Sequence, residues 1–150
     1  MTERYFDDFV IGETFTSRGA TLSESQILDF ALAYDPQPFH LDKHAAADGP
    51  FEGLIASGFQ TLALAFRIFY QANVINHCSL GSPGMDELRW LRPVRPDDTI
   101  RVEAVVKDKR ASRSRADRGT LLMDYTVRNQ KDEAVMTFTA IHILQRRAEG

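Results

Sequence analysis

The sequence predicts an α+β fold in which an antiparallel β-sheet curls around one long helix. Two observations support this prediction. Residues 58–74 are apolar on nearly every side at helical spacing, which is typical of a helix in the middle of a protein. The second half of the chain then alternates apolar and polar residues with a period of two, as half-buried antiparallel strands do. We therefore expect about five strands around one buried helix.

The elements before the long helix are expected to be one strand, over residues 14–20, and one helix. Ser23, with Gln26 three residues later, has the spacing of a capping box, and apolar residues follow at helical spacing. We expect this helix to stop at Asp35, because Pro36 disfavours helical backbone angles in the residue before it.

Four strands are expected after the long helix. Residues 100–107 and 121–128 alternate clearly, and residues 85–91 also have the composition of a strand. Residues 135–144 are apolar on both faces, so we expect this strand to lie in the interior of the sheet. A sheet of this kind covers the helix on one side only. We therefore expect a second copy of the chain to cover the remaining apolar surface, which makes a homodimer or a higher homo-oligomer.

Length and composition indicate one globular unit. A chain of 150 residues can bury most of its apolar surface in one core, so we expect residues 1–150 to form a single domain. Hydrophobic residues make up 43%, charged residues make up 26% and the net charge is −3, so we expect no nucleic-acid partner. Without an apolar run of signal-peptide or membrane-spanning length, we expect a cytoplasmic protein with no membrane partner. Cys78 is the single cysteine, which excludes an internal disulfide.

The most informative stretch for function is YDPQPFHLD, residues 34–42. Asp35 and His40 are two titratable groups five positions apart, and the prolines at 36 and 38 fix φ between them. This pattern fits an acid–base pair on a stiff support. The spacing alone fits equally well an aspartate that ends a helix and a hydrogen-bonded histidine in a rigid loop.

Other kinds of site have weaker support in the sequence. The spacing of His40, Asp42 and His44 could serve a metal ion, but no further ligands are evident nearby, and we expect no metal site. There is no serine in a nucleophile-elbow setting and no glycine-rich phosphate loop. The acid–base pair is therefore the leading candidate.

Three segments resemble a known family. Residues 35–42 resemble the D-x-N-P-x-H-x-D signature of the MaoC-like dehydratases, the (R)-specific enoyl-CoA hydratases of the hotdog fold. PFEGLIASG, which ends at Gly58, resembles the segment that leads into the central helix of that family. Residues 84–106 are similar to its strand, proline turn and following strand. The resemblance covers about residues 22–106 and implies a single hotdog domain; its first two motifs together are fairly specific.

The sequence departs from the family pattern at three positions. Gln37 stands where Asn is usual and offers the same amide on a longer arm. Ser57 stands where many members carry His, and Asp97 replaces a glycine in a turn, where Asp tolerates unusual backbone angles better than most residues. These departures bear on substrate preference and leave the candidate pair in place.

The resemblance implies a cofactor-independent hydro-lyase that adds water reversibly to a trans-2-enoyl thioester, with coenzyme A or an acyl carrier as part of the substrate. Asp35 and His40 would hold one water molecule between them. Asp35 would take a proton from it, and His40 would donate a proton to the α-carbon. The N–H of Gly58 would stabilise the enolate-like thioester oxygen at the start of the central helix. Three further residues are expected to contact substrate: Ser57, Pro38 and Phe39.

Alternative functions stay open at this point. A thioesterase of the same fold would direct water at the carbonyl carbon, and a non-catalytic hotdog protein could bind acyl thioesters or pair with a partner subunit. Residues 58–76 contain no Asp or Glu, which favours the hydratase, since thioesterases of this fold commonly carry their carboxylate on the central helix. Gly58 could instead serve only the turn into the helix, and Ser57 could only cap it.

Two further features favour ordinary structural roles. Residues 107–119 hold six basic side chains that could reach the phosphates of coenzyme A or a carrier protein, but we expect a solvated loop between two strands. Trp90 could line an acyl pocket, but we expect a core position for a strand aromatic of this kind.

Overall fold

The computed structural model describes residues 3–148. This part of the chain contains six strands that form one sheet, four α-helices and one short 3-10 helix. In chain order the elements are η1 (Phe6–Asp8), β1 (Thr14–Thr16), β2 (Ala20–Thr21), α1 (Glu24–Tyr34), α2 (Pro38–Leu41), α3 (Lys43–Ala47), α4 (Gly58–Gln71), β3 (Ser79–Trp90), β4 (Thr99–Ala111), β5 (Arg118–Arg128) and β6 (Ala134–Gln145).

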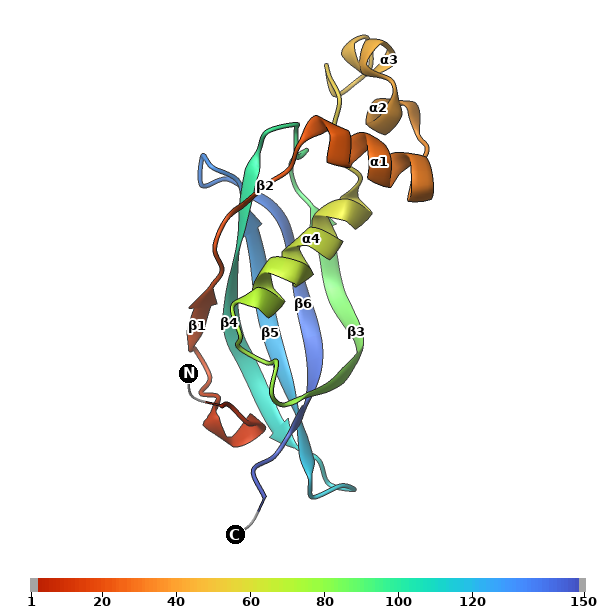
Figure 1. The fold of residues 1–150 in the computed structure, drawn as a ribbon. Helices are drawn as coiled ribbons and strands as arrows, with labels where there is room; N and C mark the ends of the chain where they lie inside the picture. Colours follow the sequence, from red (N-terminus) through yellow and green to blue (C-terminus); the bar gives the residue numbers. More distant parts are fainter. Residues whose placement is uncertain (1–2, 149–150) are drawn as a thin grey trace.

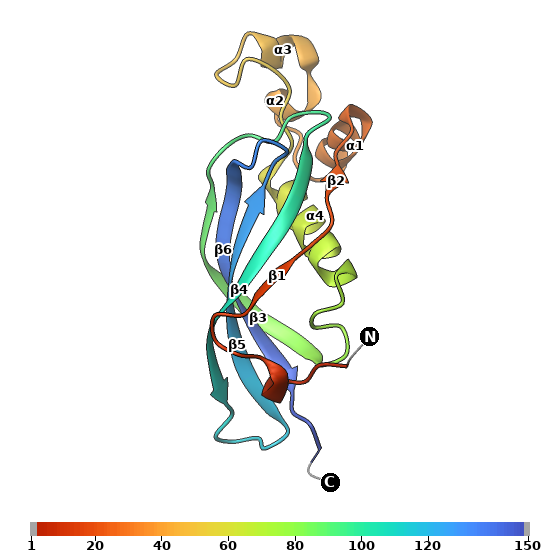
Figure 2. The same cartoon turned by 90° about the vertical axis from the view of Figure 1, so that its left-hand side faces the viewer.

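The strands form an antiparallel sheet that curves around α4. Its order is β1-β4-β5-β6-β3, and β2 also pairs with β4. Helix α4 lies along one face of this sheet, as the two perpendicular views show (Figures 1 and 2). The predicted α+β class is therefore confirmed, and β6 lies between β5 and β3, in the interior position expected for it.

The face of α4 that meets the sheet is apolar. Ala65, Ile68 and Phe69 are buried there, against sheet residues such as Val102 and Met123. The opposite flank is open, and its three large aromatic residues are exposed: Phe59, Phe66 and Tyr70. The sheet thus covers one side of the helix only, as the sequence predicted. No helix among residues 3–148 has both the length and the apolar character that crossing a membrane would take.

Several predicted boundaries were wrong. The first expected strand, residues 14–20, is divided into β1 and β2, because the Ser17 hydroxyl accepts the Val102 N–H at 2.8 Å in place of a backbone carbonyl. The long helix ends at Gln71 instead of near residue 74. Strand β3 starts six residues earlier than expected.

The basic run at residues 107–119 is only partly the solvated loop that was expected: residues 112–117 form a largely exposed connection, and the rest of the run lies in strands. Strand β4 continues to Ala111 and β5 begins at Arg118, so the connection is short. Lys109 explains part of the difference, because its Nζ donates to the carbonyl oxygens of Phe6 at 3.1 Å and Phe9 at 2.7 Å and lies over the Phe6 ring.

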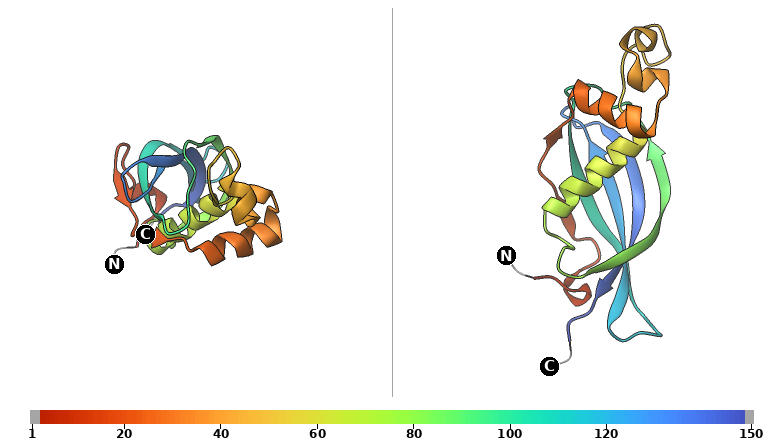
Figure 3. Two further views of the ribbon diagram at one scale, coloured as in Figure 1. Left: turned by 90° about the horizontal axis from the view of Figure 1, so that it is seen from above. Right: turned by 45° about the vertical axis from the view of Figure 1, so that its right-hand side comes forward.

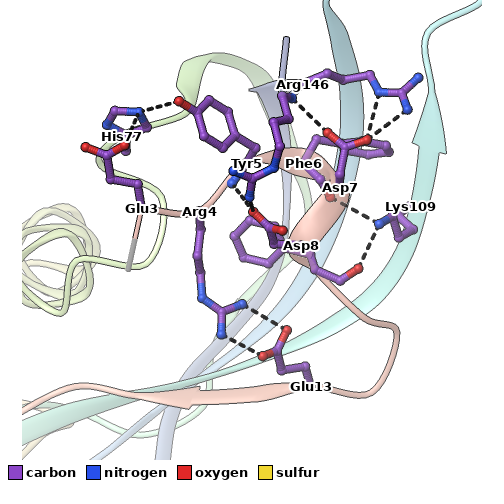
Figure 4. A network of polar contacts seen from close by, with 12 residues as sticks. Glu3, Arg4, Tyr5, Phe6, Asp7, Asp8, Glu13, His77, Lys109 and Arg146 are labelled. Atoms are coloured by element: carbon purple, nitrogen blue, oxygen red, sulfur yellow. Dashed lines mark hydrogen bonds and ion pairs between the residues drawn. The ribbon is translucent and has the colours of Figure 1, made fainter. Parts of the chain in front are cut away.

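Residues of the N-terminal segment form ion pairs with the residues that follow β6 (Figure 4). Arg146 donates to the Asp7 carboxylate at 2.8 Å, and Arg147 pairs with Asp8. The backbone N–H of Arg147 and the guanidinium of Arg146 both stabilise the charged form of Asp7. Their effect is larger than that of burial, which raises the pKa, so the pKa of Asp7 is lowered. These contacts join the two ends of the chain at the side of the molecule away from α1.

Helices α1, α2 and α3 form a cap at the other end of the sheet, beside the N-terminus of α4 (Figures 1 and 3). The predicted capping box is present: Ser23 accepts the Gln26 N–H at 3.2 Å, and Gln26 accepts the Ser23 N–H at 2.9 Å. The turn before β4 is tied to this cap by the Asp97 N–H, which donates to Leu22 at 2.7 Å. Asp97 has φ of 69°, a left-handed angle that suits the glycine it replaces.

Candidate active site

Asp35 and His40 are brought together where α1 passes into α2. Asp35 is the residue after the last turn of α1, and its N–H donates to Ala31 at 2.9 Å. Pro36 then turns the chain, and Pro38 occupies the first position of α2. At that position the fixed φ suits a helix and the missing N–H costs no hydrogen bond. The stiff loop expected here is thus a helical turn that carries His40 back toward Asp35.

The two side chains are in direct contact. His40 Nε2 lies 3.2 Å from Asp35 Oδ2, and the side chains are only 5% and 12% exposed. On the other side of the ring, His40 Nδ1 lies 2.7 Å from the carbonyl oxygen of Ile55. Because a carbonyl oxygen only accepts, Nδ1 carries a hydrogen, and Nε2 is left to face the carboxylate. One proton held between Nε2 and Oδ2 satisfies both atoms.

The carboxylate of Asp35 is held by two further donors. Gln37 Nε2 donates to Oδ1 and Ser57 Oγ donates to Oδ2, both at 2.7 Å. Burial by itself raises the pKa of Asp35. The hydrogen bonds from Gln37 and Ser57, together with the charge and hydrogen bond of His40, outweigh this effect and hold the pKa below its ordinary value. Asp35 is therefore a fixed, ionised carboxylate.

Ser57 links this carboxylate to the start of α4. Its side chain is fully buried and accepts the N–H of Phe59 at 3.3 Å, so it is the N-cap of the helix, as the sequence allowed. The same hydroxyl is the donor to Asp35. A serine hydroxyl can accept one hydrogen bond and donate another. Ser57 accepts the N–H at the start of α4 and donates its own hydrogen to Asp35.

Gly58, the first residue of α4, leaves room for an aromatic ring. A Cβ at this position would overlap the Trp90 indole, and Trp90 Nε1 donates to the Gly58 carbonyl at 3.0 Å. The backbone angle here is one that any residue adopts, so the glycine is needed for close approach and not for the turn. Among residues 3–148 the N–H of Gly58 meets no acceptor, as expected for the first turn of a helix.

The expectation that Trp90 lies in the core was wrong. It is 48% exposed, on the outer strand β3, and its ring packs against the start of α4 and the edge of Phe59. Strand β3 is an edge strand that is exposed along most of its length. A strand-like sequence there therefore does not mean that its apolar side chains are buried.

A cavity of about 400 Å³ opens beside the pair. Its polar wall contains Asp35, Gln37 and His40, and its remaining wall is mostly apolar. These other lining residues are Phe51, Ile55, Ala56, Gly58, Phe59, Thr61, Trp90, Leu91, Arg92, Pro93 and Val94. The cavity therefore joins a proton-carrying pair and a free helix N-terminus in one space.

Three residues expected to contact substrate lie behind this wall instead of in it. Pro38 starts α2, and Ser57 donates to Asp35 without lining the cavity. The Phe39 ring packs edge-on against the His40 imidazole, with centroids 4.5 Å apart, and its carbonyl accepts the Ile55 N–H at 3.0 Å. Their contacts support the orientation of the pair.

The 3.2 Å separation also corrects one geometric expectation. No water molecule fits between Nε2 and Oδ2 at that distance, so a reacting water would be held beside the pair and not between its members. The residues of the alternative metal pattern, His40, Asp42 and His44, make other contacts. Both His40 nitrogens have partners, and the Asp42 carboxylate accepts the N–H groups of His44 and Ala45 as the N-cap of α3. Residues 3–148 contain no cluster of three or more His, Cys, Asp or Glu side chains suited to a metal ion.

Two parts of the site were missed by the sequence reasoning. The Ile55 carbonyl that fixes the His40 ring is a backbone atom, which leaves no signature in a side-chain pattern. The bond from Ser57 to Asp35 spans 22 positions. The only available signal was that both motifs of the resemblance, at 35–42 and 50–58, would have to meet in space.

The fold that carries this site is similar to that of a known class of proteins, the hotdog-fold dehydratases and hydratases. The structure is similar to the crystal structure of a MaoC-like dehydratase from Rhodospirillum rubrum, with a TM-score of 0.90 and 34% identity over 97% of this chain and 99% of that one. It is also similar to the R-hydratase PhaJ1 from Pseudomonas aeruginosa, with a TM-score of 0.73 and 26% identity over 96% of this chain and 86% of that one. The protein has the hotdog fold of these structures.

The family follows from the sequence comparisons. The MaoC like domain matches residues 8–127. The protein YdeM of Bacillus subtilis is 33% identical over 129 residues, which cover 86% of this chain and 90% of YdeM. The chain belongs to the MaoC-like dehydratase family, as the three motifs indicated.

Proposed function

We propose that the protein is a hydro-lyase that interconverts a trans-2-enoyl thioester and the corresponding (R)-3-hydroxyacyl thioester. The observation that carries this proposal is the contact between His40 Nε2 and Asp35 Oδ2, at the wall of a cavity that also holds the N-terminus of α4. The family membership and the likeness to an R-hydratase support it. Coenzyme A or an acyl carrier enters only as part of the substrate, and no cofactor is needed.

The pair can supply both proton transfers of the hydration. Asp35 takes a proton from a water held beside it, and the hydroxide adds to the β-carbon. The electrons of the double bond move toward the α-carbon and the thioester oxygen, and His40 gives the proton on Nε2 to the α-carbon. One proton then remains on Asp35 and returns to Nε2 across the 3.2 Å contact, which restores the starting state. Positioned groups of this kind contribute roughly 10²–10⁴ in rate.

The developing charge on the thioester oxygen needs a donor. The N–H of Gly58 is free among the described residues, lies at the positive end of α4 and lines the cavity. We assign it this role. The absence of a side chain at Gly58 admits Trp90, whose indole then forms part of the same wall.

A thioesterase would need a carboxylate aimed at the carbonyl carbon. Helix α4, with the sequence GFQTLALAFRIFYQ, carries none, and the Asp35 carboxylate near its start is already held by three donors. The hydratase is therefore the better match to the arrangement.

We also propose that the working form is at least a homodimer. The open flank of α4 and the outer strand β3 expose several large apolar residues, more than isolated exposed side chains would account for. On β3 and just after it these are Leu80, Met85, Trp90 and Leu91. A second copy of the chain placed there would cover them, and sedimentation of the purified protein would show the dimer mass.

The decisive assay follows two signals from the same mixture. The protein is incubated with crotonyl-CoA and with a longer enoyl-CoA, and loss of the conjugated thioester absorbance is measured beside release of free thiol. We expect loss of absorbance without thiol release. Thiol release without hydration would establish the thioesterase instead. Silence in both signals over a range of chain lengths would contradict the enzymatic proposal.

A further inference from the structure

A second cavity, of about 320 Å³, lies between α4 and the inner face of the sheet. Phe59 lines both this cavity and the one beside Asp35 and His40, so the two spaces are neighbours across its ring. The walls are largely apolar. The other lining residues are Leu62, Ala63, Ala65, Phe66, Phe69, Ile75, Ser79, Gly81, Ser82, Met85, Tyr125, Phe138, Ala140 and His142. Under the proposed function, this is space for the tail of an acyl chain.

Two buried polar side chains interrupt that apolar wall. Tyr125 on β5 and His142 on β6 are 4% and 5% exposed, and the Tyr125 hydroxyl lies 2.5 Å from His142 Nε2. The Tyr125 ring is fixed by stacking on Phe138, with centroids 4.6 Å apart, and by an edge contact with Phe69 at 5.0 Å. The proposed hydration uses neither residue.

The pair has hydrogen-bonding capacity left over. Burial lowers the pKa of His142 to about 4 and raises that of Tyr125, so both are neutral near pH 7. The Tyr125 hydroxyl also lies 3.8 Å from Met123 Sδ, a weak acceptor, so the His142 nitrogen is the better acceptor for its hydrogen. With Nε2 accepting, the ring hydrogen of His142 is on Nδ1. Among residues 3–148 that nitrogen meets no partner. Beside a largely apolar cavity, a donor that no protein group satisfies favours a ligand that brings an acceptor.

We propose that this cavity receives an acyl tail that carries an acceptor oxygen, a keto or hydroxyl group, and that His142 Nδ1 is the donor to it. The proposal rests on the hydratase function above and names its substrate class. Tyr125 positions the ring: by donating to Nε2 it fixes the tautomer that leaves Nδ1–H available to the ligand. Leu62 and Phe66 on α4 hold the methylene groups on the opposite wall.

A purely structural pair makes a different prediction. In that case the side chains would only satisfy each other, and an apolar tail would be preferred, because a tail oxygen would lose its water without gaining a partner. The two readings therefore differ in the sign of the preference between plain and oxygenated tails.

Binding measurements separate this proposal from the question of turnover. Calorimetric titrations compare saturated octanoyl- and decanoyl-CoA with derivatives in which one keto or hydroxyl oxygen is moved along the tail. We expect one tail position at which the oxygenated ligand binds the wild type about fivefold more tightly than the plain ligand, the value of one hydrogen bond. In His142→Phe the ratio should shift about tenfold toward the plain chain. Crotonyl-CoA hydration, whose short tail does not need this cavity, reports on the proposed function alone.

The control variants test the hydrogen bond itself. His142→Gln keeps a side-chain donor and should retain part of the preference, while Leu62→Ala, on the apolar wall, should weaken both kinds of ligand alike. Thermal unfolding of each variant shows whether it is folded. If oxygenated and plain chains bind the wild type equally at every tail position, or if His142→Phe keeps the preference, the proposal is wrong, whether or not crotonyl-CoA is hydrated.

Discussion

Two buried histidines, His40 and His142, each meet an oxygen-bearing side chain, and they differ in their surroundings. His40 contacts the carboxylate of Asp35, which also accepts hydrogen bonds from Gln37 and Ser57. His142 contacts the neutral phenol of Tyr125 between α4 and the sheet, where no charged group takes part in the hydrogen bond.

The comparison shows that the surroundings of a buried histidine decide whether its partner is charged or neutral. The cap segment keeps a charged carboxylate at the cavity wall, because several donors compensate it for its burial and lower its pKa. The sheet offers no such compensation, so its pair stays neutral and can only donate or accept a hydrogen bond. We therefore expect proton transfer at the first pair and tail recognition at the second.

The largest expected effect is on turnover by the first pair. Asp35→Asn and His40→Ala should each lower kcat on crotonyl-CoA by at least about 10², because each removes one of the two proton transfers. Steady-state rates measured beside circular dichroism spectra would show the loss in a folded protein. His44→Ala is the control, since it removes an exposed histidine that lines neither cavity and should leave this rate within a few-fold of the wild type. If Asp35→Asn or His40→Ala stays near the wild-type rate, the assignment of the pair is wrong.

The pair of Tyr125 and His142 should dominate the pH dependence of stability between about pH 6.5 and about pH 4. His142 has a folded pKa of about 4, below the 6.5 of an unperturbed histidine, so the unfolded state takes up a proton first as the pH falls. Stability is therefore fully present above about pH 6.5 and declines toward about pH 4, by up to about 3 kcal/mol. Urea unfolding at several pH values should show this decline in the wild type. An equal decline in His142→Phe would contradict it.

The sequence predicted the parts of the molecule whose causes are local. The capping box of Ser23 and Gln26, the end of α1 before Pro36 and the alternation of β4 and β5 each depend on neighbours in the chain, and each is present. The candidate pair Asp35 and His40 could be found for the same reason. Its two members are only five positions apart, and the structure places them in contact.

The parts that could not be predicted depend on distant contacts. Strand β3 begins well before residue 85, but the register against β6 shifts on both sides of Gly81, whose φ is 114°, so the alternation disappears from the sequence there. The Trp90 ring packs against the start of α4 because Gly58, 32 positions earlier, leaves space for it. Neither contact has a local pattern.

Ser57 tests how far the first pair depends on its supporting donors. Ser57→Ala removes a hydrogen bond to Asp35, so the pKa of Asp35 should rise and the acid limb of the kcat profile should move to higher pH. We also expect kcat to fall about tenfold and the N-cap of α4 to be lost, at about 1 kcal/mol of stability. Ser23→Ala removes the cap of α1 at a similar cost, and it should leave the pH profile unchanged. A profile that shifts equally in both variants would mean that stability, not the bond to Asp35, causes the effect.

Gln37 should have the smallest effect, although it departs from the Asn that is usual in the family. Its amide reaches Asp35 Oδ1 at 2.7 Å, but the side chain is exposed, and water can replace a donor that is lost there. Gln37→Leu should raise the pKa of Asp35 and move the acid limb in the same direction as Ser57→Ala, by less. Gln37→Asn should change kcat at neutral pH by no more than about threefold, because Asp35 stays ionised there with either amide. Since Gln37 also lines the cavity, a larger change confined to KM would assign the residue to substrate contact and separate that role from its bond to the carboxylate.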